Sequence, residues 1–202
     1  MRTRIMPALT IAFLLLLPLT AVAADSYRID PAHSSLTFFV RHMGISNVRG
    51  HFDKFDGSIL LDKGEVREAS GTIQTGSINT GVLKRDDHLR TADFFDASTY
   101  PVITFKTRKV EKAEGKTFLI ADFTMRGVTR ELRLPITLSG PIKDPQGNIR
   151  IGIEAEIDIN RRDYGINYSG NLENGAALVG EKVSLVINAE AIKETPGQAA
   201  GK

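Results

Sequence analysis

The chain has 202 residues, with 26 Lys or Arg, 24 Asp or Glu and no Cys. Without cysteine it has no disulfide framework, no thiolate metal site and no thiol nucleophile. No run of Lys and Arg marks a nucleic-acid-binding surface, so we exclude a nucleic-acid partner.

Residues 1–23 have the pattern of a secretory signal peptide. Arg2 and Arg4 precede an apolar stretch over residues 5–19, and Ala21-Val22-Ala23 has the small-x-small pattern that signal peptidase reads. The apolar stretch is shorter than the ~20 residues of a membrane-spanning helix. We therefore expect export, cleavage near residue 23 and no stable membrane anchor afterwards. The loss of two arginines leaves 24 basic and 24 acidic residues, so the mature charge is near zero.

Residues 24–193 are predicted to form one all-β domain. Apolar and polar residues alternate along 36–41, 132–139, 151–159 and 183–191, as in strands with one buried face. Turn signals at 62–65, 114–116, 126–128 and 144–148 separate such runs. We count about eight antiparallel strands, followed by a flexible tail over residues 194–202.

The buried faces of these strands need a partner. They are covered either by a second sheet, as in a β-sandwich, or by closure of one sheet into a barrel. A barrel of about eight strands is packed solid or holds one small ligand. Periodicity does not distinguish these outcomes.

One helix is predicted between Asn79 and Asp93, within an otherwise all-β pattern. Asn79 or Thr80 is expected to cap it, and Asp86 and Arg90 have the i,i+4 spacing of an ion pair. The helix leads into two adjacent phenylalanines.

A catalytic site has little support in the sequence. It contains no Gly-x-Ser-x-Gly elbow, Walker loop or dinucleotide-binding glycine motif. Asp86, Asp87 and His88 could form an acid/base group, but adjacent helix positions point in different directions. We favour a hydrogen-bonding hub that holds the helix on the barrel. We also interpret His33, His42 and His51 as surface residues, and we predict no metal.

Several motifs spread over the mature chain resemble the YceI-like family. They are Tyr27–Leu36, Val48–Phe52, Ser77–Gly81, Arg85–Leu89, Asp93–Asp96, Tyr100–Phe105, Thr124–Thr129 and Asn160–Gly165. The resemblance implies a lipocalin-like, extended antiparallel β-barrel with one short helical insert. It also implies an apolar tunnel for polyisoprenoids or other long-chain amphiphiles, a periplasmic or secreted location, and no catalytic residue.

The predicted function is therefore non-enzymatic binding or transport of a long-chain isoprenoid or fatty-acid-like lipid in the periplasm. No cofactor is expected beyond such a polyisoprenoid or quinone-like ligand. Two alternatives remain: an enzyme that acts on a lipid through Asp86, Asp87 and His88, and a solid β-sandwich that serves as an interaction module. The oligomeric state is left open, with a homodimer among the options. The candidate ligand-binding residues are Phe38, Val40, Phe52, Ile59, Asp86, His88, Phe94, Phe95, Phe105, Phe123, Leu134, Ile153, Ile157, Arg161, Asp163 and Tyr164.

Overall fold

The structure, a computed structural model, describes residues 24–170 and 177–195. The predicted signal peptide and residues 196–202 of the predicted tail lie outside these ranges. Glu194, the first residue of that tail, accepts a hydrogen bond from the Ser26 hydroxyl at 2.7 Å. In the described ranges, no helix is both long and apolar enough to cross a membrane.

The described chain is almost entirely β-structure, with one α-helix, α1 (Leu83–Arg90). Short 3-10 turns cover Pro31–His33, Thr75–Ser77 and Arg161–Tyr164. The strands are β1 (Asp25–Ile29), β2 (Ser35–His42), β3 (Ser46–Phe52), β4 (Phe55–Asp62), β5 (Glu65–Gln74), β6 (Ile78–Asn79), β7 (Val102–Ala113), β8 (Lys116–Met125), β9 (Val128–Lys143), β10 (Ile149–Asn160) and β11 (Val179–Lys193).

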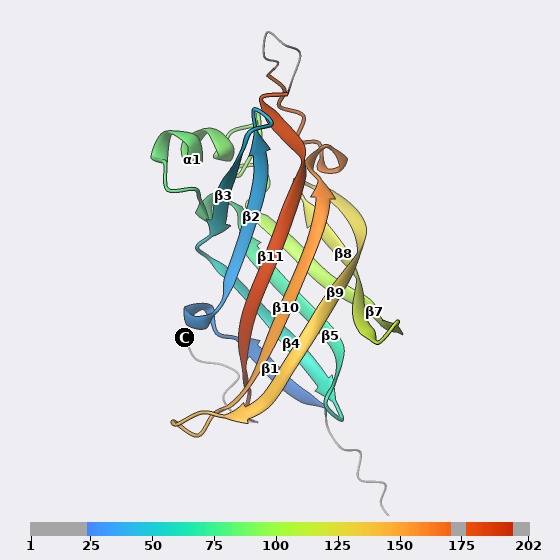
Figure 1. Ribbon diagram of the computed structural model, residues 1–202. Coiled ribbons are helices and arrows are strands. Elements are labelled where there is room, and N and C mark those ends of the chain that lie inside the picture. Colours follow the sequence, from blue (N-terminus) through green and yellow to red (C-terminus); the bar gives the residue numbers. More distant parts are fainter. Residues whose placement is uncertain (1–23, 171–176, 196–202) are drawn as a thin grey trace, which may run out of the picture.

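Eight of the described strands form a closed antiparallel barrel (Figure 1). Their order is β1-β4-β5-β7-β8-β9-β10-β11, and β1 pairs with β11 to complete the circle. The predicted extended barrel with one helical insert is therefore confirmed, and the alternative of two packed sheets is wrong. Closure satisfies the backbone hydrogen bonds that an open sheet would leave at its edges.

Two-residue hairpins connect several neighbouring strands where the sequence predicts turns. Lys63-Gly64, Glu114-Gly115 and Arg126-Gly127 all have positive φ at both central residues. This is the type I′ geometry, whose twist matches that of the flanking strands. The chain therefore passes directly from one barrel strand to the next.

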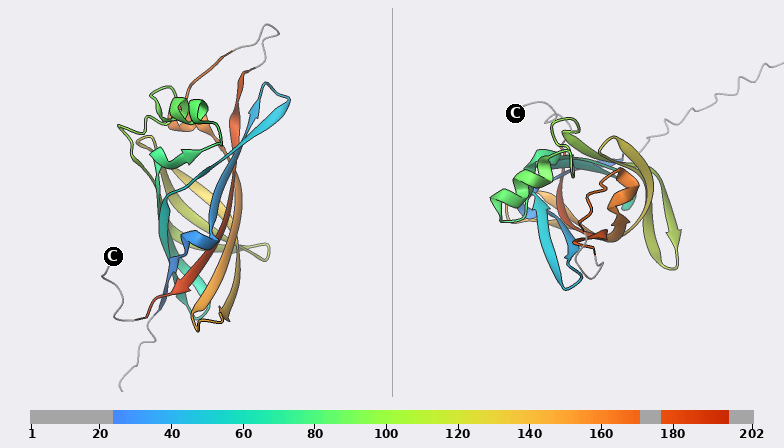
Figure 2. Two further views of the ribbon diagram at one scale, coloured as in Figure 1. Left: turned by 90° about the vertical axis from the view of Figure 1, so that its left-hand side faces the viewer. Right: turned by 90° about the horizontal axis from the view of Figure 1, so that it is seen from above.

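The barrel wall is interrupted where β1 gives way to β2. Both strands pair with β11, but Pro31 begins a 3-10 turn between them, and Asp30 caps this turn by accepting a hydrogen bond from the Ala32 N–H. Proline has no N–H to continue a strand ladder. Beyond the interruption, the β2–β3 hairpin leans away from the barrel at the end where α1 lies (Figure 2).

The inward side chains form two apolar clusters along the barrel. The lower cluster lies toward the β9–β10 loop, and the upper cluster lies under the segment that contains α1 (Figure 1). The buried residues of the lower cluster are Tyr27, Ile59, Leu61, Val66, Ala69, Leu119, Leu134, Ile136, Ile151, Ile153, Ala155 and Ala191. Those of the upper cluster are Phe38, Phe52, Ile78, Phe94, Ile103, Phe123, Met125, Ile159, Tyr164 and Ile166.

The helix is shorter than predicted, and its polar contacts differ from those expected. It begins at Leu83, after Val82 and without a side-chain cap. Asp86 instead accepts hydrogen bonds from the N–H and hydroxyl of Thr80, at 2.8 and 2.5 Å. Arg90 pairs with Asp87 rather than with Asp86. The buried Asp86 carboxylate thus fixes the chain that approaches the helix, which a propensity argument does not reveal.

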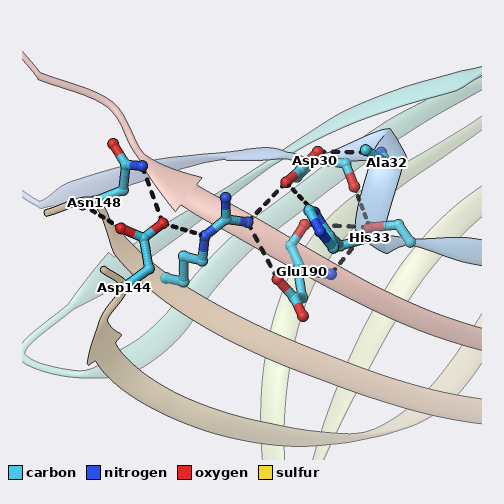
Figure 3. A network of polar contacts seen from close by, with 8 residues as sticks. Asp30, Ala32, His33, Asp144, Asn148 and Glu190 are labelled. Atoms are coloured by element: carbon cyan, nitrogen blue, oxygen red, sulfur yellow. Dashed lines mark hydrogen bonds and ion pairs between the residues drawn. The ribbon is translucent and has the colours of Figure 1, made fainter. Parts of the chain in front are cut away.

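A polar network joins chain segments at the lower end of the barrel (Figure 3). Arg150 on β10 donates to Asp144 at 2.7 Å, to Asp30 at 2.7 Å and to Glu190 at 3.2 Å. Asp144 also accepts from Asn148 within the β9–β10 loop. These bonds connect that loop with the β1–β2 interruption and β11. The pKa of Asp144 is lowered from 3.8 to about 2, and the hydrogen bond from Arg150 is the largest cause.

This pKa predicts an acid-dependent contribution to stability. A carboxylate whose pKa is lower in the folded state stabilises the fold above its unfolded pKa of about 4. The contribution is lost as the pH falls toward 2. We expect Asp144→Asn to have a lower melting temperature than wild type at pH 6, with the difference shrinking by pH 2. Asp87→Asn, which alters an exposed pair, is the control and should change little at either pH. An equal deficit at both pH values would contradict this assignment.

Candidate functional site: an apolar cavity inside the barrel

A cavity of about 260 Å³ lies inside the barrel, bordered by side chains of both clusters. Its walls are almost wholly apolar and come from all eight barrel strands and from β2 and β3, with further residues from α1 and the segment after it. The volume is close to the lower end of the ~300–1,000 Å³ that small-molecule sites usually occupy. The barrel is therefore hollow.

Small inward residues leave the space. Gly57 on β4 and Gly71 on β5 are paired directly across the ladder, and both line the cavity. Ala69, Ala155 and Ala189 line it too. The alternation of side chains places Gly57 and Gly71 on the same inward face as Ile59 and Ala69. A Cβ at position 57 would lie 2.7 Å from the Ser70 carbonyl oxygen, so a larger residue there would also force the strands to shift.

Aromatic rings form one wall. Phe38 on β2 pairs with Gly50 on β3, and its ring lies where a side chain at position 50 would be: a Cβ there would come within 2.2 Å of the ring. Phe52 lies 5.9 Å from Phe38 and 5.9 Å from Phe95, measured between ring centroids. Glycine at position 50 therefore leaves room for the tip of the Phe38 ring over β3, and the three rings contact one another in tilted and edge-on arrangements.

The segment after α1 covers the upper end of the cavity. Phe94 and Phe95 line it together with Leu89 of the last turn of α1, so the phenylalanine pair faces the interior. Phe94 also contacts Tyr168, at 4.7 Å between centroids, and His88 at 5.1 Å. Arg126 holds this segment by donating to the carbonyls of Ala92 and Gly165.

Arg161 is a buried charged residue that borders the cavity. The other charged residue of the wall, Asp56, pairs with Arg28 on the outer surface. Arg161 is 4% exposed and donates to three backbone carbonyls, of Ile166 at 2.6 Å, Gly180 at 2.9 Å and Val179 at 3.1 Å. Among the described residues, no carboxylate pairs with it.

The environment of Arg161 indicates which kind of ligand group would be favourable beside it. Burial lowers the pKa of its guanidinium, which nevertheless stays charged because arginine does not deprotonate in proteins. A guanidinium has five N–H groups, so three carbonyl bonds leave donors for another acceptor. A buried positive charge whose partners among residues 24–170 and 177–195 are neutral carbonyls is favourable for an anionic or strongly polar group nearby.

The structure brings eleven of the predicted ligand-binding residues together around the cavity. Five others do not line it. Asp86 and His88 bond within the insert, Ile157 packs against the lower cluster, Asp163 is exposed, and Tyr164 is buried edge-on against Phe123. Burial also raises the pKa of Tyr164 to about 12. The eleven that line the cavity are Phe38, Val40, Phe52, Ile59, Phe94, Phe95, Phe105, Phe123, Leu134, Ile153 and Arg161.

The prediction missed other cavity residues that share the same strand faces. Period-two alternation alone would have added the inward neighbours of the predicted residues on β2 and β10, and the inward residues of the predicted strand over 183–191. Alternation gave no signal for the glycines, because glycine has no side chain whose polarity would mark the inward face. The missed lining residues include Leu36, Gly57, Gly71, Ile73, Leu89, Ile103, Leu119, Met125, Ile136, Ala155, Ile159, Ile166, Val183, Leu185, Ile187 and Ala189.

The charged residues of the insert do not converge on one substrate position. Asp86 binds Thr80, Asp87 pairs with Arg90 at 2.9 Å, and His88 bonds to Asp93 at 2.8 Å. The side chains thus make three separate sets of contacts, as a hub requires. None of the three residues lines the cavity.

One further group could in principle approach a metal. In residues 24–170 and 177–195, the His and carboxylate side chains with suitable spacing are Asp30, His33 and Glu190. Figure 3 shows them around the β1–β2 interruption. The guanidinium of Arg150 donates to both carboxylates and so already supplies the positive charge there. His42 and His51 are not part of this group.

Comparisons with known proteins agree with this architecture. The model of the YceI-like domain matches residues 27–191. A UPF0312 protein of Staphylococcus aureus strain MSSA476 is 34% identical over 168 residues, which cover 82% of this chain and 96% of that protein. A UPF0312 protein of strain N315 is 36% identical over the same lengths.

Solved structures of similar fold include one with appreciable sequence identity. The Campylobacter jejuni YCEI protein is 30% identical, with a TM-score of 0.66 over 77% of this chain and 90% of that chain. Burkholderia cenocepacia BcnA has a TM-score of 0.69 at 21% identity, over 80% of this chain and 98% of that chain. A structure described as a polyisoprenoid binding domain from Saccharophagus degradans has a TM-score of 0.64 at 18% identity, over 83% and 98%. The chain belongs to the YceI-like family.

Proposed function

We propose that this protein is a non-enzymatic binding protein or carrier for a long-chain amphiphile, such as a polyisoprenoid, quinone-like or fatty-acid-like lipid. The observation that carries the proposal is the cavity of about 260 Å³ enclosed by apolar side chains. Removing methylene groups from water contributes ~0.8 kcal/mol for each group buried. A flexible hydrocarbon chain therefore gains affinity in this cavity without any metal or cofactor.

Two further observations support the proposal. The Saccharophagus degradans structure is described as a polyisoprenoid binding domain, and the two chains share a fold. The signal-peptide pattern of residues 1–23 supports action outside the cytoplasm, which we propose to be the periplasm of a Gram-negative cell. Native mass spectrometry of protein purified from its own host would report the mass of a bound ligand and the number of subunits together.

Filling the cavity tests where the chain binds. Ala189 lines the cavity on β11, and Ala189→Phe would place a ring in the space for the ligand. If that ring displaces two methylene groups at ~0.8 kcal/mol each, affinity falls more than about tenfold. Fluorescence titration with a series of fatty acids measures this and should show affinity rising with chain length in wild type. Ala113→Phe, at the β7–β8 hairpin, is the matched control. Equal fatty-acid affinities for Ala189→Phe and wild type would contradict the proposal that the ligand binds in the cavity.

Arg161 predicts a preference for an anionic head group. A carboxylate beside a buried guanidinium forms a charge-assisted hydrogen bond that a methyl ester lacks, and such bonds are worth about 1.5–3 kcal/mol. We expect wild type to bind a fatty acid at least tenfold more tightly than its methyl ester at pH 7.5. Arg161→Gln should reduce this ratio toward one. If acid and ester bound wild type equally, lipid binding would stand but the role of Arg161 would not.

His88 tests the enzymatic alternative. His88→Ala removes the bond to Asp93 and contacts with Phe94 and Tyr168, so we expect destabilisation of about 1 kcal/mol. Ligand affinity should stay within about twofold, because His88 does not line the cavity. Turnover of prenyl or fatty-acyl esters by wild type that disappeared in His88→Ala, with binding intact, would favour an enzyme.

A further inference from the structure

Large apolar side chains are exposed mainly at one end of the molecule. In the described part of the chain they are Met43, Ile45, Val82, Leu83 and Ile142. Ile45 is 79% exposed and Leu83 is 80% exposed. All but Ile142 belong to the β2–β3 turn or the start of α1. Neither of these segments contributes its exposed residues to the apolar clusters.

The two apolar segments project from the same end of the barrel. Figure 2 shows the tip of the β2–β3 hairpin and α1 at the end opposite the β9–β10 loop, separated from each other across one side of the rim. They are far apart in sequence, so their common position is a consequence of the fold. Together they give this end two separate apolar projections rather than one groove.

Positive charge surrounds these projections. Arg41 and Arg49 flank the hairpin tip, and residues 41–49 contain no Asp or Glu. Lys84 follows Leu83 directly. None of these three cations makes an ion pair with a described residue. Among the described acids beside Leu83, Asp86 binds Thr80 and Asp87 pairs with Arg90.

We propose that this end of the protein docks on an anionic lipid bilayer, with Ile45 and Leu83 inserted among the lipids. Apolar side chains bordered by Lys and Arg are what an interfacial, anionic-lipid-binding surface requires. A second copy of the chain fits less well, since a two-fold contact through this end would bring the cations of both copies together. The surface is separate from the cavity, so docking does not depend on whether a ligand is bound.

This docking would also serve lipid exchange, a role that rests on the proposed function. The segment that carries Leu83 continues into Leu89, Phe94 and Phe95, which cover the upper end of the cavity. Docking through Leu83 would set this cover against the membrane, where long-chain amphiphiles reside. The fold itself places Leu83 and the cover of the cavity at the same end, so this orientation of the protein on the membrane requires no conformational change.

Vesicle co-sedimentation tests the proposal, using exported protein whose N-terminus has been mapped by mass spectrometry. The probe is vesicles of phosphatidylcholine with or without phosphatidylglycerol. Wild type should partition at least tenfold more strongly onto the anionic vesicles, and added salt should weaken this binding. Ile45→Asp and Leu83→Asp should each reduce it about tenfold or more, because each removes an aliphatic side chain that would insert into the bilayer. Arg49→Gln should reduce it about fivefold.

Ile142→Asp is the matched control, since Ile142 is 63% exposed at the opposite end of the barrel. It should leave vesicle binding within about twofold of wild type. Equal losses for Ile142→Asp and Ile45→Asp would overturn the proposal, as would equal binding to neutral and anionic vesicles. Sedimentation equilibrium tests whether a second copy of the chain occupies this surface instead. If wild type is a dimer that does not bind vesicles, and Ile45→Asp makes it monomeric, the surface is a dimer interface.

Parallel fatty-acid titrations keep this inference separate from the proposed function. Ile45→Asp and Leu83→Asp should retain wild-type affinity, because neither residue lines the cavity. Lost vesicle binding with intact fatty-acid binding supports the docking surface. Intact vesicle binding by a wild type that binds no fatty acid would refute the proposed function alone.

Discussion

The pairing of β1 with β11 closes the sheet, and the rest of the structure depends on this closure. Once the barrel is closed, each strand has one face inside and one outside, so the alternating apolar positions must share a single interior. The interior is then either filled or hollow, according to side-chain volume. Closure also fixes the position of anything inserted between strands, including α1 and the segment after it.

Side-chain volume decides where the interior is filled. Tyr27, Leu61 and Ile151 pack the lower end, whereas the Gly57–Gly71 pair leaves the middle open. Cavities in protein cores cost about 24 cal/mol per Å³, so an empty space of 260 Å³ costs on the order of 6 kcal/mol. This is comparable to the ~5–15 kcal/mol net stability of a typical domain. The close approach of the Ser70 carbonyl oxygen explains the glycine at position 57, whereas the empty space itself is costly and consistent with a ligand that fills it.

Much of the fold could be predicted from the sequence because alternation and turn chemistry act locally. The I′ turns at Lys63-Gly64 and Glu114-Gly115 require positive φ, and the inward positions of β10 follow from its alternation. The cavity could be predicted only in part. Its aromatic wall was recognisable from Phe38 and Phe52, but its volume depends on which glycines face each other across two strands. That pairing depends on a β-bulge between Leu60 and Leu61, because the Lys63-Gly64 turn alone would place Gly57 opposite Ser70.

The role of the charged residues in the helical insert also could not be predicted from the sequence alone. Its composition suggested either a site or a hub, and only the tertiary contacts separate the two. Asp86 is buried because it binds Thr80, while Arg90 reaches the carbonyls of Gly76 and Ile78. These bonds use the charges to hold backbone, which leaves Leu89 and the two phenylalanines free to face the cavity. Charge therefore positions the cover of the cavity, and apolar side chains form the surface that a ligand would meet.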